Sequence, residues 1–331
     1  LNYKIYSIKS NTRKTKPRPP FTTSSLQQDA SSRLRMAPSR TMSIAQQLFQ
    51  GINLGNGEEG LITYMRTDSN VLSADSLSQI GNFIQTSYGS DYHSEKKYKT
   101  RSANAQEAHE AIRPTSINRT PESIEKFLSE DQLKLYDLIW KRTVASQMKE
   151  SENKKTTVIT STEDEKYKFI SEYDELIFDG FKKLFPQKEG DKLPNIVEDD
   201  KIILESVNKE QKFTQHTPRY SEASLIKTME ELGVGRPSTY ASILNTIKEK
   251  KYIWVINRSI YISPVGNALV EELKKHFSES VMDYKFTEKM ENDLDLISNG
   301  SLNRNDFIKS FWSNFEPIKN NYEKIADENP R

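Results

Sequence analysis

The feature that most constrains the fold of this chain is a change in its hydrophobic pattern near residue 150, which is reversed near residue 212. Before the first change, apolar residues recur three or four positions apart, which is typical of amphipathic helices. The clearest run comprises Leu133, Tyr136, Trp140, Val144 and Met148. Between the two changes, β-branched and aromatic residues form short runs separated by acidic turns, at 156–161, 167–173 and 202–207. The sequence therefore predicts a multidomain α+β protein that is mainly helical.

The first helical region predicts short helices around one buried segment. Helices are expected over 24–35, 39–50 and 73–89, and a longer one follows a capping box that starts at Ser129. Residues 61–66 (LITYMR) form a β-branched and aromatic run that predicts a buried strand.

The second helical region has the outline of a winged helix-turn-helix. A helix is expected over 222–232, a glycine-containing turn follows, and Ser238 is positioned to cap a second helix. Two strands, 252–256 and 259–263, then form a hairpin. Two helices, a short turn and a hairpin are typical of DNA-binding modules.

The net charge of +1 hides a strong segregation of charge. Residues 1–40 carry nine Lys or Arg against Asp29 alone, a net charge of +8, and 219–258 carry seven against four Glu, a net charge of +3. Residues 150–210 carry ten Lys or Arg against sixteen Asp or Glu, a net charge of −6. The basic regions could meet phosphates, and the plain alternative is a solvated surface.

Composition excludes several kinds of site. The absence of cysteine rules out disulfides, thiol nucleophiles and cysteine-based zinc sites in this chain, and the four histidines are too scattered for a multi-histidine metal site. No run of 18 apolar residues predicts a membrane span, and the basic N-terminus lacks the apolar region of a secretory signal. We therefore expect no metal ligands in this chain, no membrane partner and a cytoplasmic protein.

Tyr64 and Arg66 are the first candidates for catalysis. A tyrosine in a strand is usually a core residue, but in a strand Arg66 would share a face with Tyr64. A phenol, with its pKa near ~10, attacks phosphorus only where cations stabilise the developing charge. A guanidinium stays charged and grips phosphate oxygens in a bidentate manner, so it suits that role.

Two further clusters could contact phosphates. His109 and Arg113 lie in the run AHEAIRP, where the alternative is a surface histidine and a local ion pair between Glu110 and Arg113. Arg236, Ser238 and Thr239 lie in the turn GRPSTY, where free amides and hydroxyls at a helix N-terminus can bind an anion. Simple capping by Ser238 is the alternative there, and both can hold.

Five motifs, in this order, resemble bacterial type IA DNA topoisomerase I. They are FTTSSLQQ at 21–28, LITYMRTDS at 61–69, NAQEAHEAIRPT at 104–115, GRPSTYA at 235–241 and FTEKMENDL at 286–294. The resemblance covers essentially the whole chain. It implies a toroidal core with winged-helix-like helical modules and a β-rich arch: an arch from 1–16 and 150–212, a tyrosine-bearing module from 17–149 and a DNA-binding module from 213–331.

The resemblance also implies an activity. In this family of ATP-independent isomerases, the tyrosine of the ITYMRTDS motif cleaves one DNA strand, becomes joined to the 5′ phosphate, and the break is resealed after another strand has passed. This assigns the nucleophile to Tyr64, the cation at the scissile phosphate to Arg66, and DNA contacts to His109, Arg113, Arg236, Ser238 and Thr239. The expected partners are single-stranded and negatively supercoiled DNA, the expected location is the nucleoid, and a monomer is expected.

The sequence departs from the family in one respect. The family's Toprim domain carries an Asp-x-Asp-x-Glu site for magnesium and a catalytic glutamate, and no such motif occurs here. The family's zinc ribbons also require cysteine. We therefore expect a piece of a longer protein that needs a Toprim domain for activity, with Mg²⁺ bound there and not by this chain.

Two other functions are compatible with parts of the sequence. A non-catalytic winged-helix DNA-binding protein would use the basic regions with Tyr64 in its core, and a scaffold protein would have no nucleic-acid role. A covalent DNA adduct would exclude the first, and salt-dependent DNA binding would exclude the second. The topoisomerase half of reverse gyrase is disfavoured because nothing in the chain resembles a helicase.

Overall fold

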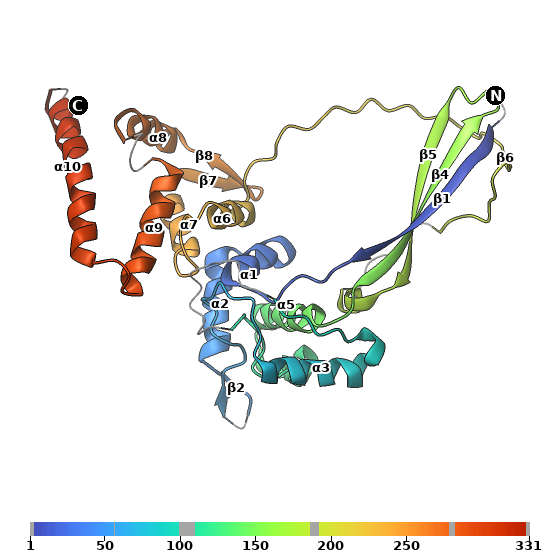
Figure 1. Cartoon of the computed structure of the whole chain (residues 1–331), viewed down its shortest axis with the longest axis horizontal. Coiled ribbons are helices and arrows are strands. Elements are labelled where there is room, and N and C mark those ends of the chain that lie inside the picture. Colours follow the sequence, from blue (N-terminus) through green and yellow to red (C-terminus); the bar gives the residue numbers. More distant parts are fainter. Residues whose placement is uncertain (1–2, 56, 99–109, 186–191, 278–281, 329–331) are drawn as a thin grey trace.

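The protein consists of a long sheet arm and two helical modules (Figure 1). The computed structural model describes residues 3–55, 57–98, 110–185, 192–277 and 282–328. The sheet arm has the strand order β5-β4-β1-β6, with all pairs antiparallel. Its strands are β1 (Tyr3–Thr15), β4 (Ser151–Thr162), β5 (Lys168–Phe178) and β6 (Lys201–Ile202).

The arm is built from segments far apart in the sequence. β1 pairs with β4 from Tyr3↔Thr162 to Thr15↔Ser151, so the N-terminal strand lies along the β-rich region that follows residue 150. The chain then returns from β6 to the C-terminal helices through residues 203–220, which have no regular structure and are almost entirely exposed (Figure 1). The strand expected over 202–207 is therefore wrong beyond Ile202, because those residues find no partner strand.

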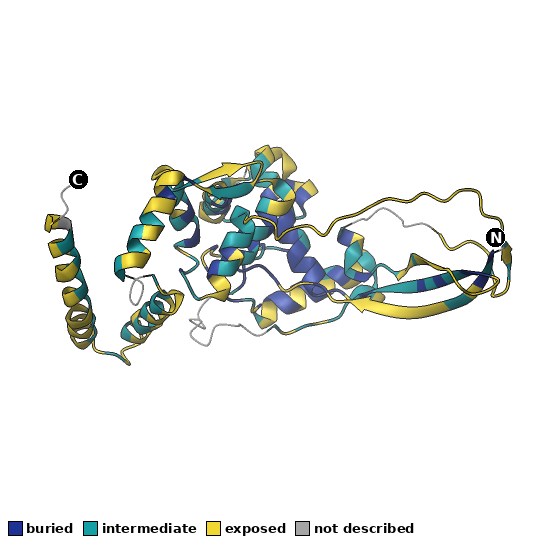
Figure 2. Ribbon diagram, turned by 90° about the horizontal axis from the view of Figure 1, so that it is seen from above, coloured by how far each residue is buried: buried dark blue, intermediate teal, exposed yellow. Residues whose placement is uncertain are grey.

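The module that carries Tyr64 holds the main hydrophobic core, which Figure 2 shows as the densest group of buried residues. Its elements are α1 (Thr23–Asp29), α2 (Pro38–Gln50), β2 (Ile52–Asn53), β3 (Glu58–Glu59), α3 (Ala74–Tyr88), α4 (Pro121–Ile124) and α5 (Glu130–Ser146). Ser73 caps α3 and Ser129 forms a capping box with Gln132 at the start of α5, both as predicted. The core forms because α2, α3 and α5 turn their apolar faces inward.

One helix prediction in this module holds in outline, and one strand prediction is wrong. The helix expected over 24–35 is α1 followed by a π-helical turn at Ala30–Leu34, which ends where Arg35 takes a left-handed conformation at φ 58°. Residues 61–66 are not a strand. Ile62 makes one isolated bridge with Pro114, because the hydrogen-bonding groups of this segment are taken by several different parts of the module rather than by one neighbouring strand.

The C-terminal module has a much smaller core. Its elements are α6 (Glu222–Glu231), α7 (Tyr240–Glu249), β7 (Ile253–Ile256), β8 (Ser259–Ile262), α8 (Pro264–Phe277), α9 (Tyr284–Ser298) and α10 (Arg304–Glu328). The order from α6 to β8 confirms the winged-helix outline, with a tight turn at Asn257 and Arg258, both at positive φ. The buried apolar residues of its core are Ile226, Met229, Tyr240 and Leu244.

The two helical modules pack against each other through α1 with α6 and α2 with α7 (Figure 1). Ser24 of α1 donates a hydrogen bond to a carboxylate oxygen of Glu230 on α6, with 2.8 Å between the two oxygens. This interface brings the segment around Tyr64 towards the start of α7.

Candidate active site

Tyr64 lies on an irregular loop whose side chains alternate between the core and the surface. Leu61, Ile62 and Met65 are buried, whereas Tyr64 is 36% exposed and Arg66 is also exposed. Both side chains are exposed, but the strand on which they were expected to share a face is absent. The ring of Tyr64 meets the ring of Phe49 edge to face, with 5.4 Å between centroids.

Thr63 attaches one side of this loop to the segment 111–113. The Thr63 amide donates to the carbonyl of Arg113 at 2.9 Å, and its hydroxyl donates to the carbonyl of Ala111 at 2.7 Å. The same hydroxyl accepts a hydrogen bond from the Arg113 amide at 3.0 Å. These bonds fix the backbone on the N-terminal side of Tyr64, and they bring the segment 111–113 next to the Tyr64 loop.

Thr23 attaches the other side of the loop to the start of α1. Its buried hydroxyl donates to the carbonyl of Met65 at 2.7 Å and accepts from the amide of Thr67 at 2.9 Å. Its amide donates to the carbonyl of Thr67 at 2.9 Å. The backbone is therefore held on both sides of Tyr64 and Arg66 while their side chains point outward.

Arg113 lies beside this loop and is held by an ion pair. Its Nε donates to Oε2 of Glu110 at 2.7 Å, its Nη2 lies 2.5 Å from the same oxygen, and its Nη1 donates to the carbonyl of Pro114 at 2.9 Å. The other carboxylate oxygen of Glu110 accepts from the amide of Ser73, the residue that caps α3, at 3.1 Å. The local ion pair weighed from the sequence is thus present. His109 lies outside the described residues.

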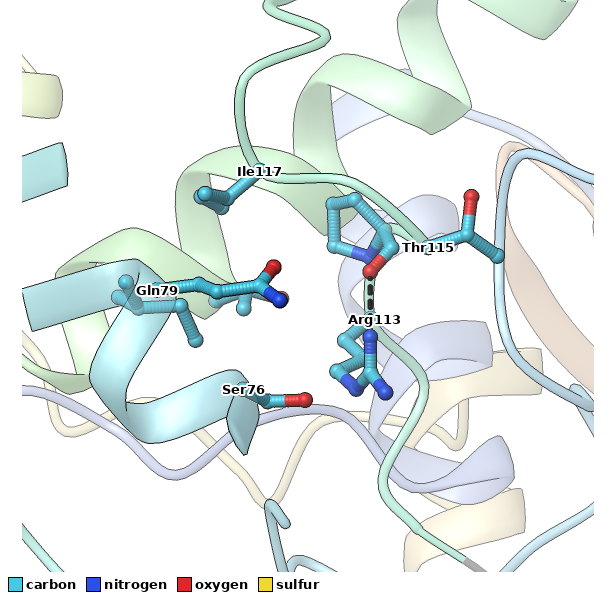
Figure 3. Close-up of a pocket in the computed structure, with 8 residues that line it drawn as sticks. Ser76, Gln79, Arg113, Thr115 and Ile117 are labelled. Carbon is cyan, nitrogen blue, oxygen red and sulfur yellow. Dashed lines mark hydrogen bonds between the residues drawn. The ribbon is translucent and has the colours of Figure 1, made fainter. Parts of the chain in front are cut away.

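Arg113 also borders a small pocket between α3 and the segment 113–117. Figure 3 shows Ser76 and Gln79 of α3 on one side of it and Arg113 and Thr115 on the other, with Ile117 above Gln79. Arg113 is only about one fifth exposed, at 18%. Its guanidinium is therefore partly covered and has fixed partners, whereas the Arg66 side chain is exposed.

The turn before α7 holds Arg236, Ser238 and Thr239. The Arg236 amide donates to the hydroxyl of Thr239 at 2.8 Å, and the Thr239 amide donates back to the carbonyl of Arg236 at 2.8 Å. Gly235 is at φ +85°, and a Cβ there would lie 3.2 Å from both the Thr239 hydroxyl and the Cδ1 of Ile243. Glycine is required because the turn is both left-handed and close to its neighbours.

The side chains of this turn have different surroundings. The Nη2 of Arg236 pairs with Asp295 of α9 at 2.8 Å, and the Arg236 side chain is 29% exposed. Ser238 is exposed and does not cap the helix: α7 begins at Tyr240, and Thr239 occupies the cap position without a side-chain cap bond. The prediction of capping by Ser238 is therefore wrong, because the hydroxyl of Thr239 closes the turn instead.

The turn and the Tyr64 loop lie at the same interface between modules. Tyr240 is buried at the start of α7, and burial raises its pKa, with smaller contributions from the charges of Glu230, Asp68 and Glu291. Asp68 belongs to the loop that carries Tyr64, and its charge helps to raise the pKa of Tyr240, the first residue of α7. The loop that carries Tyr64 thus lies near the start of α7, and Arg113 is joined to that loop through Thr63.

Sequence reasoning missed the residues that position the loop. Thr23, Thr63 and Glu230 received no role, yet the two threonines hold the backbone around Tyr64 and Glu230 joins the modules. For Thr63, a hydroxyl within the apolar run 61–65 was the available signal, because a buried hydroxyl needs a hydrogen-bond partner.

The described residues do not offer a metal site. In the ranges that the structure covers, no group of three or more His, Asp or Glu side chains is arranged to hold an ion. Glu110, the carboxylate nearest in sequence to Arg113, is occupied by that guanidinium and by the Ser73 amide. In the same ranges, no helix combines the length and the apolar character needed to cross a membrane.

The chain is similar to known proteins over nearly its whole length. The family model described as DNA topoisomerase matches residues 2–309. DNA topoisomerase 1 of Rickettsia felis is 39% identical over 336 residues, covering 99% of this chain and 43% of that protein. DNA topoisomerase 1 of Xylella fastidiosa (strain Temecula1) is 43% identical over 327 residues, covering 95% of this chain and 40% of that protein.

A solved structure shows the same fold. The full-length topoisomerase I from Thermotoga maritima superposes with a TM-score of 0.86 at 37% identity, covering 96% of this chain and 52% of that one. The chain thus spans about two fifths of these curated relatives and about half of the solved one. These matches confirm the resemblance and the expected fold class: this chain belongs to the bacterial type IA DNA topoisomerase I family.

Proposed function

We propose that this chain provides the cleavage tyrosine and the DNA-contacting side chains of a topoisomerase that relaxes negatively supercoiled DNA. The hydroxyl of Tyr64 attacks a backbone phosphorus, so that a bond to the tyrosine oxygen forms as the bond to the 3′ oxygen breaks. The phenol gives up one proton, and the departing 3′ oxygen takes up one. The products are a 5′-phosphotyrosine and a free 3′ hydroxyl, and the reverse reaction reseals the strand after strand passage. The observation that carries this proposal is the exposed Tyr64 on a loop whose backbone is held on both sides.

Arg66 stabilises the charge that develops on the phosphate. It follows Tyr64 by two residues and is exposed, which suits a guanidinium that meets phosphate oxygens. Because Thr23 fixes the carbonyls of Met65 and Thr67, the backbone on both sides of Arg66 needs little rearrangement when DNA binds.

The remaining motif residues contact the DNA backbone. Ser238 is exposed at the end of its turn, Thr239 and Arg236 lie in the same turn, and Arg113 adjoins the Tyr64 loop. Both arginines have carboxylate partners, Glu110 and Asp295, so each must share its guanidinium with a phosphate or exchange partners when DNA binds. The resemblance assigns a similar contact to His109.

The preferred substrate is single-stranded DNA, because the phenol must reach a backbone that pairing would obstruct. We place the protein in the cytoplasm at the nucleoid and expect it to act as a monomer. The division into an arch (1–16 and 150–212), a tyrosine-bearing module (17–149) and a DNA-binding module (213–331) remains our proposal. The pairing of β1 with β4 and the two separate cores support it.

Magnesium use is compatible with the family, but the described residues do not fit the ion. A missing general acid costs about 10²–10⁴-fold in rate, and a missing charge-stabilising group costs a similar factor. We therefore expect these 331 residues alone to bind single-stranded DNA without relaxing supercoils at any magnesium concentration. Joining them to the Toprim domain of a relative should restore relaxation.

An agarose-gel assay on negatively supercoiled plasmid, with and without the added Toprim domain, tests this expectation. Denaturing the joined protein on a 5′-extended oligonucleotide should trap a covalent adduct, and peptide mapping should place it on Tyr64. An adduct on another tyrosine would overturn the assignment of the nucleophile. Relaxation by the 331 residues alone would reveal a metal site in this chain, with Glu110, Asp68 and Glu107 the first residues to test.

A further inference from the structure

Three arginines surround one buried carboxylate at the base of the sheet arm. Asp29, the last residue of α1, is 10% exposed. Its carboxylate forms a buried ion pair with Arg142 of α5, lies 3.3 Å from the Nη1 of Arg18 and 3.4 Å from the Nε of Arg33. Arg18 belongs to the connection that follows β1, and Arg33 lies in the turn after α1.

Arg142 by itself neutralises Asp29. Its side chain is 8% exposed, its Nη1 donates to the carbonyl of Pro19 at 3.3 Å, and its guanidinium lies 4.2 Å from the centre of the Phe21 ring. Burial lowers the pKa of Arg142, the charge of Asp29 opposes this, and the charges of Arg18 and Arg33 lower it further. One carboxylate and three guanidiniums leave a local surplus of two positive charges.

Arg18 and Arg33 carry that surplus on the surface. Their side chains are 69% and 49% exposed, and their contacts with Asp29 are longer than the 2.7–2.9 Å that is typical of strong charge-assisted bonds. Each guanidinium has five N–H donors in a planar fork, so most remain available to a ligand. Arg33 also lies over the ring of Phe185, 5.3 Å from its centre.

Further cations lie on the strand that leads to this cluster. Arg13, Lys14 and Lys16 are exposed on β1 and its exit, immediately before Arg18. Among these three, Lys14 is paired with Glu152 at 2.7 Å. The arm base therefore presents several exposed cations, together with one aromatic ring.

We propose that Arg18 and Arg33 bind phosphates of a single DNA strand at the base of the sheet arm, as a contact separate from the Tyr64 site. The planar guanidiniums of Arg18 and Arg33 can each bind phosphodiester oxygens through two N–H donors. Sites that bind single-stranded DNA commonly combine cations with an aromatic side chain. This inference rests on the proposed function and extends it to a second place on the protein.

The short helix α1 relates this contact to the cleavage loop. Thr23, its first residue, holds the loop that carries Tyr64, and Asp29, its last residue, holds the arginines. Six residue steps of about 1.5 Å place these two ends about 9 Å apart along the helix. A strand bound at the arm base is thus close to the cleavage loop without occupying it.

Salt-dependent binding of the 331-residue chain to a fluorescent oligothymidylate of about 20 nucleotides tests the proposal. Arg18→Gln with Arg33→Gln should flatten the slope of log K against log salt by about 1.4, since each single-strand phosphate contact contributes about 0.7. The matched control is Arg40→Gln, which removes one exposed charge that is paired with Asp131. The control should leave the slope unchanged, and thermal melting should show that every variant is folded.

The outcomes separate this inference from the proposed function. Normal binding by the original chain with an unchanged slope in the double variant overturns the arm-base contact alone. No DNA binding by the original chain overturns the proposed function as well. If the double glutamine variant is unfolded, Arg18→Lys with Arg33→Lys replaces it as the test. The lysine variant preserves charge, so the salt slope should be unchanged. A weaker affinity for the oligothymidylate would show that the planar shape of the guanidinium contributes to binding. A lysine pair indistinguishable from the original in both slope and affinity would overturn the role of the guanidinium forks.

Discussion

The Tyr64 loop and the Gly235–Thr239 turn position their functional groups in opposite ways. In the loop, the groups proposed for chemistry are the exposed side chains of Tyr64 and Arg66, and the backbone is held by buried hydroxyls from Thr23 and Thr63. In the turn, the side chains proposed for DNA contact also hold the structure: Thr239 accepts from the Arg236 amide, and Arg236 pairs with Asp295 of α9.

This difference predicts which substitutions should change DNA cleavage without changing the stability of the fold. In the loop, changing a functional side chain should leave the fold intact, while changing a supporting threonine should disturb both. In the turn, a single substitution changes the DNA contact and the packing of α9 together. The modules differ accordingly, since the loop rests on the large core and the turn on the smaller core around Ile226 and Leu244.

The largest effect is expected for Tyr64→Phe in the chain joined to a Toprim domain. Loss of the hydroxyl removes the nucleophile, so covalent adducts and plasmid relaxation should both disappear. Because the residue is partly exposed, the free energy of unfolding should change by less than about 0.5 kcal/mol. Tyr88→Phe on α3 is the matched control and should still form the adduct. Residual relaxation by Tyr64→Phe would contradict the assignment of Tyr64 as the nucleophile.

A supporting residue should show the reverse pattern. Thr23→Val leaves the Met65 carbonyl and the Thr67 amide without their hydroxyl partner, at about 1–3 kcal/mol for each buried group, and the looser loop should slow cleavage by up to about 10²-fold. Urea unfolding and adduct formation with a suicide oligonucleotide measure the two effects. Thr41→Val in α2 removes a buried hydroxyl that bonds the carbonyl of Ala37 instead, and it should not affect cleavage.

Arg236 tests the turn. Arg236→Gln should weaken binding to single-stranded DNA and flatten the salt slope by about 0.7. Asp295→Asn removes the same ion pair but keeps the cation, so it should preserve or strengthen binding. Each should cost at most about 1 kcal/mol of stability, because the pair is partly exposed. Equal losses of affinity in both variants would mean that Arg236 acts through the fold alone.

The smallest effect concerns a tyrosine whose hydroxyl is structural, in contrast with Tyr64. Tyr92 donates to Asp179 at the arm base with 2.7 Å between the oxygens, and this hydrogen bond, with burial, raises the pKa of Tyr92 to about 12. The folded-state value is above the usual ~10. The contribution to stability is therefore fully present below pH ~10 and is lost as the pH rises through 12.

A pH series of urea unfolding measures this contribution. The stability difference between the original chain and Tyr92→Phe should be constant from pH ~7 to ~9 and should shrink above pH ~10. Its size should stay below about 1 kcal/mol, because solvent screens the pair. A difference that grows with pH would contradict the assigned hydrogen bond.

Local signals determined much of the architecture. The caps at Ser73 and Ser129, the hairpin at Asn257 and Arg258 and the change of pattern at residue 150 depend on neighbours in the sequence, so the sequence alone predicted them. The strand expected over 61–66 failed because apolar β-branched residues signal burial, whereas a strand also needs a partner with continuous hydrogen bonding.

The sequence by itself identified Tyr64 and Arg66 as candidates, because residue chemistry and spacing are local properties, and the resemblance added their roles. Only the tertiary structure decided how they are presented. Thr23 is 41 positions before Tyr64 and Arg113 is 49 positions after it, and these segments supply the hydrogen bonds that hold the loop. A buried hydroxyl must find a partner, but which partner it finds depends on how distant segments pack, and no local pattern records that choice.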